Sequence, residues 1–260
     1  MQYKTVALTF FSLTLLFAGC SRENSSTNEE IRLVADTTTT GVDSTSSIVL
    51  SASTLMTYPN EVLLTGLKDQ RLVTIYRKVQ DANKNLIEEY AGNSSSYYYG
   101  DETRSHYSFF MPGINLQLGY NLVNIAHYNF KTEKTKMLFE RPALIRSIYY
   151  PSFEQDSLNK KPINRNYFFV SVYNEDTNLD TLLNKGDLRR FFMFNADASE
   201  QKLMIPADYS VVRSQYDSAN DVMYIFARHD ANNDGRSQPT EPLHVFWISL
   251  ANPGEGTRLY

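Results

Sequence analysis

The hydrophobic pattern divides the chain into an apolar N-terminus, a polar stretch and a long body. From residue 48 onward, apolar and aromatic runs alternate with turn-forming segments such as Asp81–Asn85. Such short runs, bounded by turn signals, are typical of β-strands. The strands expected are Glu61–Leu64, Leu72–Tyr76, Tyr107–Met111, Asn121–Tyr128, Tyr167–Tyr173, Arg190–Asn195, Val222–Ala227 and Leu243–Leu250. Because no stretch keeps a helical period beyond about two turns, the body is predicted to be all-β.

Two parts of the C-terminal half resemble each other at an offset of about 54 residues. Tyr167–Asp176 aligns with Asp221–Asp230, and the strands that follow also match. Four-stranded units of this length resemble β-propeller blades, so we expect propeller-like repeats over residues 48–260. The alternative is an immunoglobulin-like sandwich at 48–140 followed by a β-repeat module at 141–260, because Leu116–Ile125 resembles late strands of that sandwich.

The first twenty residues have the features of an export signal. Lys4 precedes an apolar run that ends at Phe17 and is too short to span a bilayer. The run leads into Ala18, Gly19 and Cys20, and small residues before a lone Cys resemble the lipobox of bacterial lipoproteins. The resemblance implies that residues 1–19 are a signal peptide and that Cys20 is acylated with chains such as palmitate. The implied location is the bacterial cell envelope, with the outer membrane favoured because Ser21 follows Cys20.

Residues 20–47 form the stretch between this anchor and the body. The stretch is rich in Ser and Thr and carries more acids than bases. It has little apolar surface to bury, so we predict a disordered tether. Its short apolar patch, Ile31–Ala35, could dock weakly and is given no role.

Composition narrows the choice of function. The chain has 260 residues and a formal net charge of −4, which argues against a nucleic-acid partner. Its one Cys excludes an internal disulfide, and lipidation would also exclude a thiol nucleophile. No zinc-protease, nucleophile-elbow or nucleotide-binding motif is present. Trp247 and its repeat counterpart Met193 are expected to lie in the core.

The sharpest motif lies at residues 230–241 and fits D-x-[DN]-x-[DN]-G-x5-E. This is the pattern of an EF-hand calcium loop, in which oxygen ligands wrap around the ion and a Gly at the sixth position makes the sharp turn. The expected calcium ligands are Asp230, Asn232, Asp234, the carbonyl of Arg236, Gln238 and Glu241. Because prolines and an aromatic strand follow, we expect the loop to connect two strands rather than two helices.

A related loop lies at residues 176–187. Its corresponding ligands would be Asp176, Asn178, Asp180, the carbonyl of Leu182, and Asp187. Thr181 stands where Gly belongs, and a β-branched residue tolerates positive φ poorly. The loop is therefore either a weak second calcium site or a turn that no longer binds metal.

Two functions from different classes remain open. The first is a non-enzymatic, calcium-binding envelope lipoprotein that binds a protein or glycan partner. The second is an envelope hydrolase acting on polysaccharide with a site assembled from loops. A pocket holding two carboxylates about 5–9.5 Å apart would favour the hydrolase, whereas a flat or aromatic surface without such a pair would favour the binding module.

Overall fold

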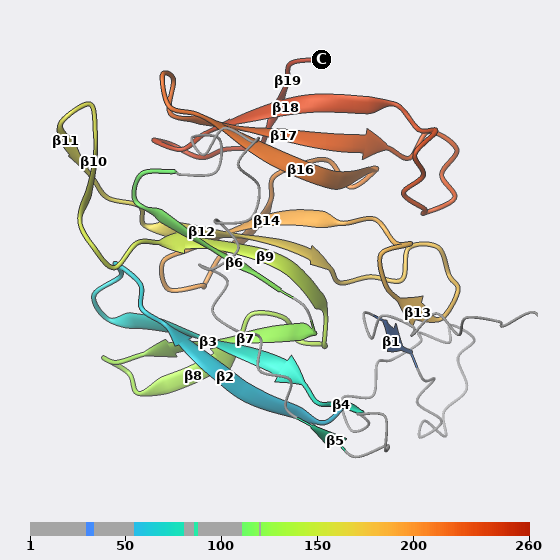
Figure 1. The fold of residues 1–260 in the computed structure, drawn as a ribbon, viewed down its shortest axis with the longest axis horizontal. Helices are drawn as coiled ribbons and strands as arrows, with labels where there is room; N and C mark the ends of the chain where they lie inside the picture. The colour runs from blue at the N-terminus through green and yellow to red at the C-terminus, as the bar shows by residue number, and fades with distance from the viewer. Residues whose placement is uncertain (1–29, 34–54, 81–85, 88–110, 120) are drawn as a thin grey trace, which may run out of the picture.

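The structure is a computed structural model that describes residues 30–33, 55–80, 86–87, 111–119 and 121–260. All regular secondary structure within these ranges is β (Figure 1), so the all-β prediction is confirmed. In the same ranges, no helix has the length and apolar character needed to cross a membrane. The predicted signal peptide, Cys20 and most of the predicted tether lie outside the described residues.

Three antiparallel sheets make up the body. The first contains, in order, β2 (Thr57–Leu63), β3 (Gln70–Arg77), β7 (Leu122–Asn129) and β8 (Lys134–Met137). The middle sheet contains β15 (Gln201–Leu203), β14 (Arg190–Asn195), β12 (Tyr167–Tyr173), β9 (Leu144–Pro151) and β6 (Ile114–Leu118). The third contains β16 (Tyr209–Asp217), β17 (Val222–His229), β18 (Leu243–Ser249) and β19 (Thr257–Arg258).

Three strand pairs complete the described secondary structure. They are β1 (Ile31–Arg32) with β13 (Leu182–Leu183), β4 (Val79–Gln80) with β5 (Leu86–Ile87), and β10 (Asp156–Leu158) with β11 (Lys161–Ile163). The pair β1–β13 matters for the site, because β13 lies within the loop at residues 176–187.

The three sheets stack as layers, with the middle sheet between the other two (Figure 1). Two apolar clusters fill the gaps. In β12, Phe168 and Val170 belong to the cluster shared with the first sheet, whereas Phe169 belongs to the cluster shared with the third. Because both faces of β12 are covered, every one of its residues is buried. This explains its nearly continuous apolar and aromatic sequence, interrupted only by Ser171, since a strand with one exposed face would alternate apolar with polar residues.

Some of the predicted strands agree with the structure, whereas the described sheets do not form the predicted architecture. The predicted bounds of β12 and β14 are correct, whereas Tyr107–Met111 lies almost wholly outside the described residues. Among the described strands, the sheets do not close into a barrel or a propeller. A division at residue 140 is not followed by the pairing either, because β6 joins β9 in the middle sheet.

Two further expectations need correction. Trp247 was expected in the core, but its side chain is 36% exposed, because it lies on the face of β18 opposite the buried Phe246 and Ile248. Residues 20–47 were expected to be disordered, with at most weak docking of Ile31–Ala35; the structure describes residues 30–33 of this range, where Ile31 lies in β1, is buried, and pairs with Leu183. Its apolar side chain fills a small cluster with Val123 and other residues of the body.

Candidate metal centre

The two acidic loops lie at the same end of the stack (Figure 1). The loop at 230–241 connects β17 to β18, and the loop at 176–187 lies between β12 and β14. Paired strands of neighbouring sheets therefore deliver both loops to one edge. The sequence prediction that the motif connects two strands, rather than two helices, is confirmed for 230–241.

Within the 230–241 loop, side-chain oxygens accept hydrogen bonds from the loop's own backbone N–H groups. The Asp230 carboxylate accepts hydrogen bonds from the N–H groups of Asp234 (3.1 Å) and Gly235 (2.9 Å). Asn232 Oδ1 accepts from the Asp234 N–H (3.2 Å), and Asp234 Oδ1 accepts from the Arg236 N–H (2.9 Å). Gly235 has φ +70°, a conformation that costs an L-residue about 1–2 kcal/mol. The loop is thus curled so that its acids face inward.

Three carboxylates meet inside this curl. Asp230, Asp234 and Glu241 each offer an oxygen, and these oxygens all lie within 4.8 Å of one another. Glu241 Oε2 accepts a hydrogen bond from the Gln238 N–H (2.7 Å), but Glu241 Oε1 is buried with no hydrogen-bond partner among the described residues. A buried unpartnered polar atom costs about 1–3 kcal/mol. A cation would satisfy this oxygen and offset the repulsion among the three acids, so the triad can hold a metal ion.

The other predicted ligands are arranged around Asp234. Asn232 Nδ2 and Gln238 Nε2 both donate to Asp234 Oδ2, at 2.9 and 2.7 Å. Their amide oxygens therefore lie on side chains already gathered at the triad. Arg236 is on the exposed side of the loop, where its N–H binds Asp234. All the donors in this set are oxygens, which suits a hard cation rather than a thiolate- or imidazole-binding metal.

The 176–187 loop has the same backbone fold. The Asp176 carboxylate accepts from the N–H groups of Asp180 (3.2 Å) and Thr181 (2.9 Å). Asn178 Oδ1 accepts from Asp180 N–H (3.0 Å), and Asp180 Oδ1 accepts from Leu182 N–H (2.9 Å). These four bonds match those of the first loop position by position. Thr181 adopts φ +66°, so the loop keeps its turn despite the missing Gly.

The two loops differ at their last acid. The Asp187 side chain is fully buried, and both of its oxygens are occupied: Oδ1 accepts from the Thr177 N–H and Oδ2 from the Asn184 N–H, each at 2.9 Å. Burial raises the pKa of the Asp187 carboxyl, and the backbone N–H groups oppose that rise. Among the described residues, the only acidic group arranged to hold a metal is the triad of 230–241. Asp187 is thus not gathered with Asp176 and Asp180 into such a group.

The loops also contact each other directly. Thr177 Oγ1 donates to the Gly235 carbonyl (2.6 Å), and the Ser237 N–H donates to the Gly186 carbonyl (3.3 Å). A Cβ on Gly235 would lie only 1.9 Å from the Thr177 carbonyl oxygen. Sequence reasoning missed Thr177, because no local pattern signals that one loop will pack on another.

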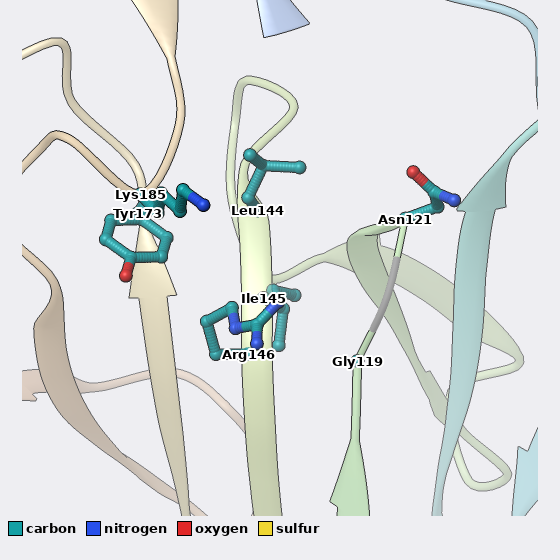
Figure 2. Close-up of a pocket in the computed structure, with 7 residues that line it drawn as sticks. All are labelled: Gly119, Asn121, Leu144, Ile145, Arg146, Tyr173 and Lys185. Atoms are coloured by element: carbon teal, nitrogen blue, oxygen red, sulfur yellow. The ribbon is translucent and has the colours of Figure 1, made fainter. Parts of the chain in front are cut away.

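A small pocket lies elsewhere, between the β6–β7 turn, β9 and the end of β12 (Figure 2). Its lining residues are Gly119, Asn121, Leu144, Ile145, Arg146, Tyr173 and Lys185. The lining is apolar and basic and includes no carboxylate. It therefore does not supply the acid pair that glycoside hydrolysis requires.

No protein-family model matches the chain, and no curated protein matches it.

Proposed function

We propose that this chain is a calcium-binding, non-enzymatic module of the bacterial cell envelope, anchored to the membrane through lipid on Cys20. The observation that supports calcium most directly is the unpartnered, buried Oε1 of Glu241 beside Asp230 and Asp234. Its partner would be a protein or a glycan. Residues 20–29 and 34–47 would link the anchor to the body, with β1 docked between them.

Calcium fits this loop better than magnesium. Calcium takes six to eight oxygens in flexible geometry, whereas magnesium demands near-octahedral coordination and retains waters. The loop offers Asp230, Asn232, Asp234 and Glu241 as side-chain donors, with the Arg236 carbonyl and Gln238 completing the set. Extracellular calcium modules bind at roughly 10⁻⁴–10⁻³ M, which suits permanent filling outside the cytoplasm.

The ion would have a structural role. It would neutralise the three acids and fix the crossing from β17 to β18. The 176–187 loop would remain metal-free and support the first loop through Thr177. We therefore propose one bound calcium rather than two.

A scaffold or binding role is better supported than hydrolysis. One oxygen from each acid of the triad lies within 4.8 Å of the others, so the three carboxylates converge on one point as metal ligands do, whereas glycosidases hold two carboxyl groups roughly 5–9.5 Å apart around the substrate. The pocket of Figure 2 has an apolar and basic lining that includes no carboxylate. No observation on the described residues favours the hydrolase.

We also infer that the middle and third sheets descend from one duplicated unit, related to a propeller blade. In support, β9 pairs with β12 and β16 with β17. The Ser147↔Ser171 and Ser214↔Ile225 pairs stand at equivalent positions. The two acidic loops also share their internal hydrogen bonds.

Calcium titration by calorimetry, with thermal melts, tests the metal proposal on the chain lacking only the predicted signal peptide. At about 100 times Kd, binding adds roughly 2.7 kcal/mol, or about 5–10 °C in melting temperature. Glu241→Gln should abolish the heat and the shift. Asp176→Asn, an acid-to-amide change in the 176–187 loop, should leave both intact.

Three outcomes would contradict the proposal. They are no response of the wild-type chain to calcium, an equal response to magnesium at the same concentration, or equal losses in Glu241→Gln and Asp176→Asn.

A further inference from the structure

The outer face of the third sheet has an unusual composition. In β17, Met223, Ile225 and Ala227 are fully buried against the middle sheet. The alternate residues Tyr224 and Phe226 therefore project from the opposite side. Figure 1 shows this sheet at the end of the stack, with no other sheet beyond it.

Tyr224, Phe226 and Trp247 form an aromatic platform on this face. Trp247 of β18 lies directly across from Tyr224, and Val245 lies across from Phe226. The Cβ atoms of residues opposite one another on neighbouring strands are about 4.5–5.5 Å apart, so Trp247 and Tyr224 are neighbours on this face. The Tyr224 hydroxyl donates to Asp217 Oδ2 (3.3 Å), which holds that ring in place.

Two arginines border the platform. The Arg213 guanidinium lies over the Phe226 ring, 3.3 Å from its centroid. Arg228 follows Phe226 by two residues and so shares its face. Within the described residues, neither arginine has a salt bridge or a side-chain hydrogen bond, and Arg228 Nε is buried without a partner. The nearby carboxylate of Asp217 is already engaged by Tyr224 and Asn220.

We propose that this outer face binds an acidic glycan. Sugar rings would stack on Trp247 and Tyr224, and the sugar carboxylates would pair with Arg213 and Arg228. Arginine suits this role because its planar fork matches a carboxylate with two hydrogen bonds. The inference rests on the proposed binding role, but it does not depend on the calcium loop.

Charge favours this occupant over a second copy of the chain. In a symmetric dimer through this face, the same patch would meet itself and bring the unpaired arginines of both copies into one interface, where like charges repel. The chain as a whole has a formal net charge of −4, so its overall electrostatic field repels a polyanion. The attraction for an acidic glycan would therefore have to come from the arginines of this face.

The lone tryptophan of the chain reports directly on the face. The test is a titration of Trp fluorescence with oligogalacturonate, and with a neutral maltooligosaccharide of equal length, in EDTA. We expect saturable quenching by the acidic sugar only, weakened by added salt. Arg213→Gln combined with Arg228→Gln should raise the Kd at least tenfold, whereas Arg141→Gln, an exposed control elsewhere, should not.

Each contrary outcome overturns the proposal. Equal binding of the neutral sugar, no binding of either, or an unchanged Kd in the double variant would exclude recognition of an acidic glycan here. Sedimentation showing a dimer that Arg213→Glu disrupts would assign the face to a second copy. Because EDTA is present throughout, a failed calcium titration leaves this result unaffected, and the converse holds.

Discussion

Replacing Gly235 by Ala tests whether the two loops support each other. The φ of +70° costs an L-residue about 1–2 kcal/mol. The new Cβ would also lie 1.9 Å from the Thr177 carbonyl oxygen, so one loop must move. That movement breaks the bond from Thr177 Oγ1 to the Gly235 carbonyl, worth about 1 kcal/mol. The expected loss is about 2–3 kcal/mol in the free energy of unfolding.

Urea unfolding in EDTA measures this loss without any contribution from metal. A calcium titration of the same variant should then show weaker binding, because Gly235 lies between the ligands Asp234 and Arg236. The matched control is Gly254→Ala, since a Cβ at Gly254 would meet nothing within 4 Å. A Gly235→Ala stability within about 0.5 kcal/mol of wild type, with an unchanged calcium Kd, would refute the mutual support of the loops.

Three further predictions concern single residues. Thr181→Gly should raise the free energy of unfolding in urea by about 0.5–1 kcal/mol. The strain that Thr181 carries at φ +66° exceeds the conformational entropy that a Gly adds to the unfolded chain; a lower stability of the variant would contradict this. Asp187→Ala should cost about 3 kcal/mol, because it leaves the partly buried N–H groups of Thr177 and Asn184 without an acceptor; urea unfolding within 1 kcal/mol of wild type would disprove it. Burial lowers the pKa of His127, so the unfolded chain binds more protons and stability should fall as pH drops below about 6.5. Unfolding between pH 7.5 and 5 should show a flatter dependence for His127→Gln.

Much of the metal loop could be predicted from the sequence, because its ligands are close along the chain. The spacing from Asp230 to Glu241 places three acids in one curl, and the structure gathers them. Likewise, the nearly continuous apolar run of β12, interrupted only by Ser171, indicates a strand covered on both faces. In both cases the deciding interactions are local or follow from strand periodicity.

What could not be predicted depends on contacts between distant segments. The position of Trp247 depends on which sheet ends the stack, and nothing in its own strand says that no layer lies beyond it. Ile31 docks by pairing with Leu183 of β13, which lies within the 176–187 loop about 150 residues further along the chain. Composition alone made that segment look disordered.

The last acid of the two loops differs in length by one methylene group. In both loops, side-chain oxygens accept the same set of hydrogen bonds from backbone N–H groups. In both, the last acid also accepts a hydrogen bond from the N–H of the residue three positions earlier. In the longer Glu241, the second oxygen is left without a partner beside two other acids. In the shorter Asp187, it reaches the Thr177 N–H, and Thr177 in turn donates its hydroxyl hydrogen to Gly235. A shorter side chain at this position thus changes a potential metal ligand into a support for the neighbouring loop, which explains why two loops of one pattern need not bind two ions.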